Sequence, residues 1–272
     1  MCDVILAVIE RPETARQTLD GARRLADLMQ SARINVLAPR LPPEATILPT
    51  EEVLTAHKAE QIRAREQARI VALRPVFDEW RQTAQDAQVT VDWADIEGPA
   101  DLLTAEWGRR ADIVVLDRPI RREGRSDPPV VQAALFDTDR PVLMMPPGPV
   151  AGLGRCVAIA WRDDPRAIRA VLAARRLLAP ATEVHVLTGV REGAPPPRLP
   201  DILAEHDIAA TLHVLPVGPG VFGAELLARA HALGADMLVM GAYAHRPWRE
   251  LILGGVTRHM LGEADLPVFM RH

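Results

Sequence analysis

The sequence predicts an α/β protein of two tandem, doubly wound domains, each built on a five-stranded parallel sheet. Short apolar runs alternate with segments of helical periodicity, which is the pattern of strand–helix–strand units. The 272 residues are 48% hydrophobic but only 4% aromatic, as expected for aliphatic parallel-sheet cores. The order of elements restarts after a Pro- and Gly-rich linker at residues 146–152, so we expect domains at residues 1–147 and 153–272.

In the first half, apolar runs mark the strands and helical spacing marks the helices. The expected strands are residues 4–9, 34–38, 89–93, 113–116 and 141–145. The expected helices are residues 12–29, 51–87, 99–109 and 130–136. Pro12 occupies a first helical turn, where proline is tolerated. Pro75 removes an N–H group from the second helix, so we expect a bend near it.

The second half repeats this order. The expected strands are residues 156–161, 184–187, 212–216, 237–240 and 267–270. The expected helices are residues 165–178, 202–206, 225–233 and 256–261. Asp164 precedes Pro165 at the start of the first of these helices, which predicts a carboxylate N-cap.

The two halves also match residue by residue. Ala111–Val115 parallels Ala235–Val239, and Asp139–Val142 parallels Asp265–Val268. A repeat of this length is too long for a solenoid unit. It therefore indicates two copies of one domain rather than a repetitive array.

Composition and charge argue against nucleic acid and membranes as partners, and against a disulfide framework or a metal motif. The net charge of −4 gives no reason to expect nucleic acid or an anionic membrane as a partner. No apolar run reaches the roughly 20 residues that a membrane span needs, and no signal-peptide pattern precedes the strand that begins at Val4. The two cysteines, Cys2 and Cys156, form neither a disulfide framework nor a metal motif. We therefore expect a cytoplasmic protein without a metal site.

The sequence carries no recognisable catalytic motif. It lacks a G-x-S-x-G nucleophile elbow, a Walker loop and an H-E-x-x-H pair. An α/β hydrolase or transferase of nucleotides would need a phosphate loop after the first strand, and neither residues 9–12 nor residues 162–165 supply one. We assign no catalytic residue and expect, at most, slow ATP hydrolysis.

The most informative stretch lies near the C-terminus. The apolar run from Ala235 ends at Gly241, which predicts a buried strand leaving the sheet. Gly254 and Gly255 then open a short amphipathic segment. A helix that begins with glycine offers free backbone N–H groups to an anion, so a phosphate-binding mouth is expected between strand end and helix start.

These residues resemble the universal stress proteins. That family carries glycine, two residues, glycine, nine residues, glycine, and then serine or threonine; the positions here are Gly241, Ala244, Gly254 and Gly255. Two positions match and two depart, and residues 249–260 and 264–268 are also similar to the family. The resemblance implies five-stranded parallel sheets that pair through their last strands, with the two domains paired inside one chain. A homodimer remains open.

The resemblance also implies a function. It identifies the chain as a stress-response binding or regulatory module whose second domain alone binds ATP with Mg²⁺, or another adenine nucleotide. The candidate binding residues are Gly241, Ala244, Gly254, Gly255, Val256, Thr257, Arg162 and Val190. The first six would line the phosphates, and Arg162 stands where the family has an aspartate beside the nucleoside. The alternative is a nucleotide-free structural protein that acts through its dimer surfaces.

The corresponding positions of the first domain depart further from the family pattern. Asp117 stands where the glycine after the fourth strand is expected, and Ile9 stands where the nucleoside aspartate is expected. A carboxylate at residue 117 would repel phosphate. We therefore expect no nucleotide in the first domain.

Overall fold

The computed structural model describes residues 3–30, 32–46, 55–83, 89–119, 128–242 and 255–272. Within these ranges the chain forms two compact units. The first comprises residues 3–117 and 128–140, and the second comprises residues 118–119 and 141–272. The sequence repeat predicts a domain boundary at residues 147–153. By contacts in space, residues 141–147 group with the second unit, where the strand β5 (Val142–Met145) pairs with the last strand of the chain. The domain boundaries expected from the sequence stay a prediction.

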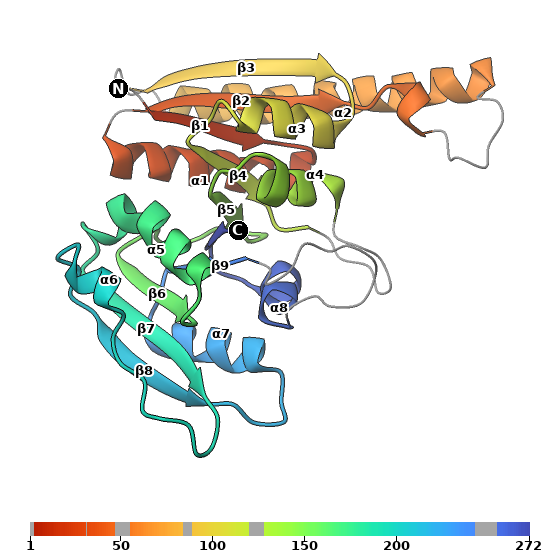
Figure 1. Cartoon of the computed structure of the whole chain (residues 1–272). Coiled ribbons are helices and arrows are strands. Elements are labelled where there is room, and N and C mark those ends of the chain that lie inside the picture. Colours follow the sequence, from red (N-terminus) through yellow and green to blue (C-terminus); the bar gives the residue numbers. More distant parts are fainter. Residues whose placement is uncertain (1–2, 31, 47–54, 84–88, 120–127, 243–254) are drawn as a thin grey trace. The chain divides into compact units, whose positions relative to one another are not determined.

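The first unit holds four strands of a parallel sheet in the order β3-β2-β1-β4 (Figure 1). The strands are β1 (Asp3–Val8), β2 (Ala32–Arg40), β3 (Thr90–Glu97) and β4 (Ile113–Asp117). The helices are α1 (Pro12–Met29), α2 (Ala56–Thr83), α3 (Ala100–Gly108) and α4 (Pro129–Gln132). A 3₁₀ turn at Pro43–Thr46 and a π-helical turn at Ala133–Asp137 complete the unit.

Aliphatic and aromatic side chains hold the helices of this unit against the sheet. Leu19, Leu25 and other apolar residues recur at helical spacing on α1, and all of them are buried. Helix α2 runs uninterrupted through Pro75. The ring of Phe77 lies 4.9 Å from that of Trp93 on β3, so α2 packs on the outer strand of the sheet.

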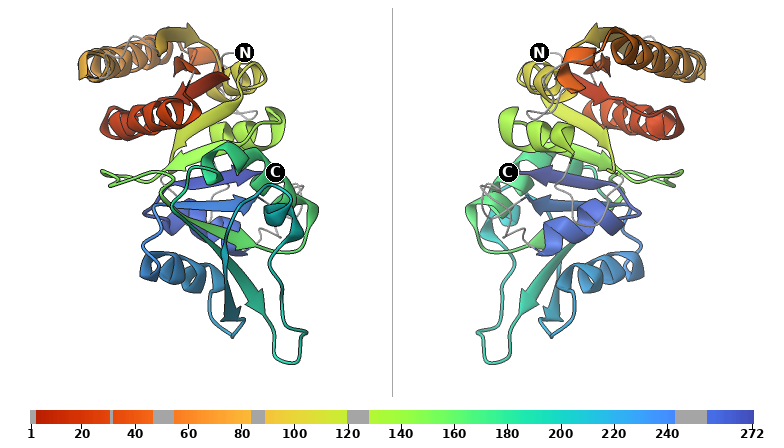
Figure 2. Two further views of the ribbon diagram at one scale, coloured as in Figure 1. Left: turned by 90° about the vertical axis from the view of Figure 1, so that its left-hand side faces the viewer. Right: turned by 90° about the vertical axis from the view of Figure 1, so that its right-hand side faces the viewer.

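The second unit contains the complete five-stranded parallel sheet, in the order β10-β9-β6-β7-β8. The strands are β6 (Cys156–Trp161), β7 (Glu183–Val190), β8 (Thr211–Pro216), β9 (Met237–Gly241) and β10 (Val268–Arg271), and β5 (Val142–Met145) lies antiparallel to β10. The helices are α5 (Pro165–Leu178), α6 (Asp201–Ala204), α7 (Phe222–Ala232) and α8 (Gly255–Glu263). Helix α5 covers one face, and α7 and α8 cover the other (Figure 2). The predicted α/β fold class is confirmed.

The sequence repeat has a structural counterpart. The backbone N–H of Val4, in β1, donates to the carboxylate of Asp112 at 2.9 Å, and Asp112 N–H donates back to Val4 O at 2.7 Å. In the second unit, Cys156 N–H donates to Asp236 at 3.3 Å, and Asp236 N–H donates to Cys156 O at 2.8 Å. Each half therefore has an equivalent aspartate, Asp112 or Asp236, that hydrogen-bonds to the start of its own first strand.

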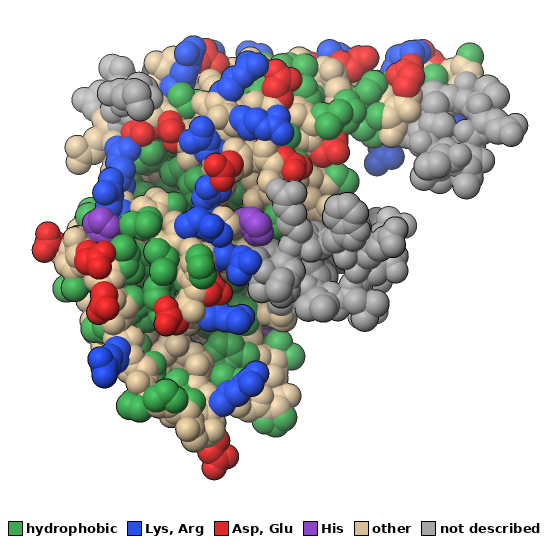
Figure 3. Space-filling model, viewed as in Figure 1, with side chains coloured by type: hydrophobic (Ala, Val, Ile, Leu, Met, Phe, Trp, Pro, Cys, Tyr) green, Lys and Arg blue, Asp and Glu red, His purple; other side chains and the backbone are tan. Residues whose placement is uncertain are grey.

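Charged side chains of both signs are intermixed on the visible surface, for example along α2 and β3 at the top of Figure 3. Ion pairs link β2 to β3 there: Arg33 Nε lies 2.6 Å from Asp92 Oδ2, and Arg40 Nε lies 2.9 Å from Asp95 Oδ1. Among the described helices, none combines the length and the apolar composition that crossing a bilayer requires.

Candidate functional site

The carboxyl ends of the parallel strands bring three of the predicted residues to one edge of the second sheet. Strand β6 ends at Trp161, just before Arg162; β7 ends at Val190 and β9 ends at Gly241. The strands are adjacent and parallel, with Ala160 beside Met240 and Trp161 beside Thr188. Ligands of open α/β sheets bind at this edge. Ala244 and Gly254 lie outside the described residues.

Helix α8 supplies the expected helix start. Gly255 is its first residue and is exposed, and a Cβ atom added there would meet no atom of the described residues within 4 Å. At the start of a helix, N–H groups such as those of Gly255 and Val256 have no acceptor in a preceding turn and can donate to an anion. Val256 is half-buried and Thr257 is only 4% exposed. The described residues therefore leave the Cβ position of Gly255 open.

The middle of α8 packs closely on the start of α7. A Cβ atom added at Gly223, near the start of α7, would lie 2.6 Å from Cβ of His259. At the neighbouring strand end, a Cβ atom added at Gly189 would lie 2.6 Å from the ring of Phe222. These contacts join α8 to α7, and α7 to the carboxyl end of β7.

Gly241 has a packing role of its own. A Cβ atom at this position would lie 2.9 Å from Cβ of Arg166 and 3.0 Å from the backbone N of Ala167, both in the first turn of α5. The missing side chain therefore lets α5 approach the end of β9. As predicted, Asp164 caps this helix: its Oδ1 accepts from the N–H groups of Arg166 and Ala167 at 2.9 and 3.0 Å.

Two arginines, Arg162 and Arg166, lie near this edge. The side chain of Arg162 is 78% exposed and its Nε is 3.7 Å from Asp164 Oδ2, which is a loose ion pair. Arg166 was not predicted as a site residue. Its Nε is buried and has no hydrogen-bond partner among the described residues. A buried donor without a partner is costly, so Arg166 is suited to an anionic ligand.

The same edge of the first unit is occupied by the unit's own side chains. Arg11 and Thr14, at the start of α1, both donate to Oδ2 of Asp117 at the end of β4. Burial, followed by the charge of Asp117, raises the pKa of the neighbouring Glu10 to about 6. Arg69 of α2 donates to the backbone O of Glu10 at 3.0 Å. Asp117 is thus neutralised by internal partners.

The two units therefore differ at equivalent edges. In the first unit, an ion pair joins the end of β4 to the start of α1. In the second unit, the equivalent strand ends in Gly241, and the Arg166 that packs beside this glycine has a buried Nε without a hydrogen-bond partner among the described residues. Most of the loop after β4 lies outside the described residues.

Among known proteins, this chain matches solved structures alone. No protein-family model and no curated protein matches this chain. A universal stress protein from Archaeoglobus fulgidus superposes with a TM-score of 0.70 at 16% identity, covering 98% of this chain and 97% of its own. Two structures from Pseudomonas aeruginosa, the first a functionally unknown protein, give TM-scores of 0.60 and 0.59 at 16% identity. They cover 99% of this chain and 92% and 93% of their own. The chain therefore has the fold of a universal stress protein over its whole length.

Proposed function

We propose that the chain is a tandem universal stress protein, a cytoplasmic binding module whose second domain holds ATP, with Mg²⁺, or another adenine nucleotide. The observation that carries this proposal is the gathering of anion-binding groups at the carboxyl edge of the second sheet. The open first turn of α8 starts at Gly255, and the buried Nε of Arg166 has no partner among the described residues. The likeness in fold to a universal stress protein, over 98% of this chain, supports the family part of the proposal.

Each predicted residue has a definite part in this proposal. The backbone N–H groups of Gly255, Val256 and Thr257 would bind the phosphates, together with Gly241, Ala244 and Gly254. The exposed Arg162 would compensate phosphate charge, and Val190 would flank the base. The chain's own groups would bind and orient the nucleotide. Mg²⁺ would neutralise phosphate oxygens when bound.

Restriction of the site to the second domain follows from the first unit's internal ion pair. A nucleotide at the first edge would have to displace Arg11 from Asp117 and leave a carboxylate facing phosphate. We also propose that the two domains act as one intramolecular pair. No general base has been identified, so any hydrolysis would be slow.

The test is isothermal titration of ATP and Mg²⁺ into the intact chain, with one aliquot denatured first to detect co-purified nucleotide. The sharpest variant is Gly255→Glu. A carboxylate in the first turn favours the helix dipole and has free space, so the fold should persist. Its charge would repel phosphate, and we expect at least a roughly tenfold loss of affinity.

The matched control is Ala209→Glu. This exposed residue precedes β8, at the opposite edge of the same sheet, and receives the same change in charge. Wild-type binding of one nucleotide per chain, kept by the control and lost in Gly255→Glu, would support the proposal. No co-purified nucleotide and no heat up to millimolar ATP would overturn it. The chain would then act through its surfaces.

A further inference from the structure

A cluster of chemically reactive side chains lies at the opposite, amino-terminal edge of the second sheet. Cys156 and Glu183 are the first residues of β6 and β7 and pair with each other in register. His185 lies two residues along β7 from Glu183, on the same face of the strand. One ligand atom from each of these three residues lies within 4.8 Å of the other two.

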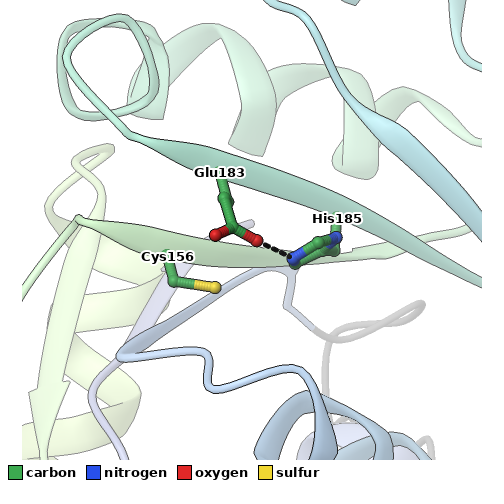
Figure 4. Close-up of side chains that lie close together, drawn as sticks. All are labelled: Cys156, Glu183 and His185. Carbon is green, nitrogen blue, oxygen red and sulfur yellow. Dashed lines mark ion pairs between the residues drawn. The ribbon is translucent and has the colours of Figure 1, made fainter.

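His185 is the unusual member of this cluster. It is only 8% exposed, and its Nε2 has no hydrogen-bond partner among the described residues. Glu183 Oε2 lies 3.2 Å from Nε2, but outside hydrogen-bonding geometry. Figure 4 shows that the thiol of Cys156 and the carboxylate of Glu183 both point toward this ring. The buried ring nitrogen therefore faces a thiol and a carboxylate, and its one described contact is the ion pair with Glu183, which needs a protonated ring.

We propose that Cys156 Sγ, a carboxylate oxygen of Glu183 and His185 Nε2 bind one divalent transition-metal ion of the zinc type. Sulfur, imidazole nitrogen and carboxylate oxygen are the ligands that zinc takes in proteins. Three protein ligands leave a fourth position for water. Glu183 is 61% exposed, so its side chain can move inward to complete the site.

The surroundings also favour a cation. The Cys156 thiol donates to the backbone O of Leu233 at 3.4 Å, and Leu233 caps the carboxyl end of α7. This end of a helix carries partial negative charge. The carboxylate of Asp236 binds the N–H of Cys156 at 3.3 Å and adds a full negative charge nearby.

The neighbouring ring of His213 determines the proton positions in the cluster. Arg229 NH2 lies 3.0 Å from His213 Nδ1, and arginine can only donate, so this nitrogen accepts. The proton of His213 is therefore on Nε2, which lies 3.2 Å from Nδ1 of His185 and donates to it. The proton of His185 is left on Nε2, where the metal would bind.

Metal binding requires the opposite tautomer in both rings. His185 would donate from Nδ1 to His213 Nε2, and His213 would then present a proton on Nδ1 to Arg229. The contact between Arg229 and His213 would have to open. Arg229 therefore opposes the metal, and His213 is a positioning residue that orients His185.

The test uses Co²⁺ as a spectroscopic probe on the intact chain after removal of metal by a chelator. We expect one Co²⁺ per chain, a thiolate-to-cobalt charge-transfer band, and displacement of the band by Zn²⁺. Cys156→Ser should abolish the band, and His185→Ala should lower Zn²⁺ affinity at least about 100-fold in a competition with a chromophoric chelator. Cys2→Ser and His206→Ala are the matched controls and should leave both unchanged.

The variant Arg229→Gln tests whether the cluster binds a metal or has a structural role alone. Glutamine can accept a hydrogen bond from His213 Nδ1–H, which supports the tautomer that a metal needs. We expect Zn²⁺ affinity to rise roughly tenfold, the equivalent of one net hydrogen bond. Arg175→Gln, on the exposed side of α5, is the control and should have no effect.

Two results would overturn the proposal. One is the absence of a cobalt band in the wild-type chain, and the other is a band that persists in Cys156→Ser. Circular dichroism of each variant without metal checks the fold. Because Zn²⁺ binds the folded state, it should also raise the Tm of the wild-type chain but not that of Cys156→Ser.

Discussion

Replacing Asp236 with alanine should destabilise the second unit by about 2–3 kcal/mol. Asp236 Oδ1 accepts from the backbone N–H groups of Gly154, Arg155 and Cys156 at 2.9, 3.1 and 3.3 Å. A hydrogen bond to a charged acceptor contributes about 1.5–3 kcal/mol when it is buried. Asp236 is half-buried, so water would replace part of the hydrogen bonds that the three N–H groups lose. The loss of unfolding free energy therefore stays near the contribution of one or two such bonds.

The loop before β6 is shaped around this carboxylate. A Cβ atom added at Gly152 would lie 2.6 Å from Asp236 Oδ2, and Gly154 has a φ of +81°. In an Asp236→Ala variant, the loop could fill the space of the lost carboxylate only if Gly154 gave up its positive φ. Asp236→Asn keeps one acceptor oxygen and should recover about half of the loss.

The assay must distinguish the two units, because they need not unfold together. We would follow amide hydrogen exchange of β6 and β9 by mass spectrometry in increasing urea, with β1 and β2 as the internal reference. Asp265→Ala is the matched control: its side chain is 68% exposed and contacts His231 at 2.7 Å. The control should cost no more than about 0.5 kcal/mol. Equal losses in the two variants would refute the assigned role of Asp236.

The remaining predictions concern Glu10 and two glycines. The pKa of Glu10 is raised from 4.5 to about 6 in the folded state, so its favourable contribution is complete below pH 4.5 and is lost as pH rises through 6. Glu10→Gln should therefore stabilise the first unit by up to about 2 kcal/mol at pH 7.5 and much less at pH 4.5, measured by urea unfolding. Gly241→Ala should lower Tm and cost about 1–3 kcal/mol, because the methyl group would meet the first turn of α5. Gly255→Ala has free space and should instead stabilise α8 by about 0.5–1 kcal/mol; a lower Tm for this variant would contradict the open first turn.

Periodicity was sufficient to predict the order and type of the elements. Strand β6 was predicted at residues 156–161 and has those bounds, and Asp164 was correctly predicted as an N-cap. Strand β7 was predicted to end at residue 187 but continues to Val190. The extra residues are paired with Val214–Pro216 of β8, a contact that no apolar run reveals.

The candidate edge could be predicted only in part. Because the carboxyl ends of parallel strands coincide, sequence alone could bring Arg162, Val190 and Gly241 to one side of the sheet. Arg166 was missed, since its position over Gly241 depends on how closely α5 approaches β9. The cluster of Cys156, Glu183 and His185 was missed for a similar reason: only the register of β6 against β7 brings these residues together.

Comparison of the two halves separates what the fold needs from what a ligand needs. Asp112 and Asp236 occupy equivalent positions and fasten equivalent strands, so the fold explains both. Asp117 and Gly241 are also equivalent, yet the first binds Arg11 and the second makes room for α5. The difference at this one position therefore closes the first edge with an internal ion pair, and in the second unit it lets α5 approach the end of β9.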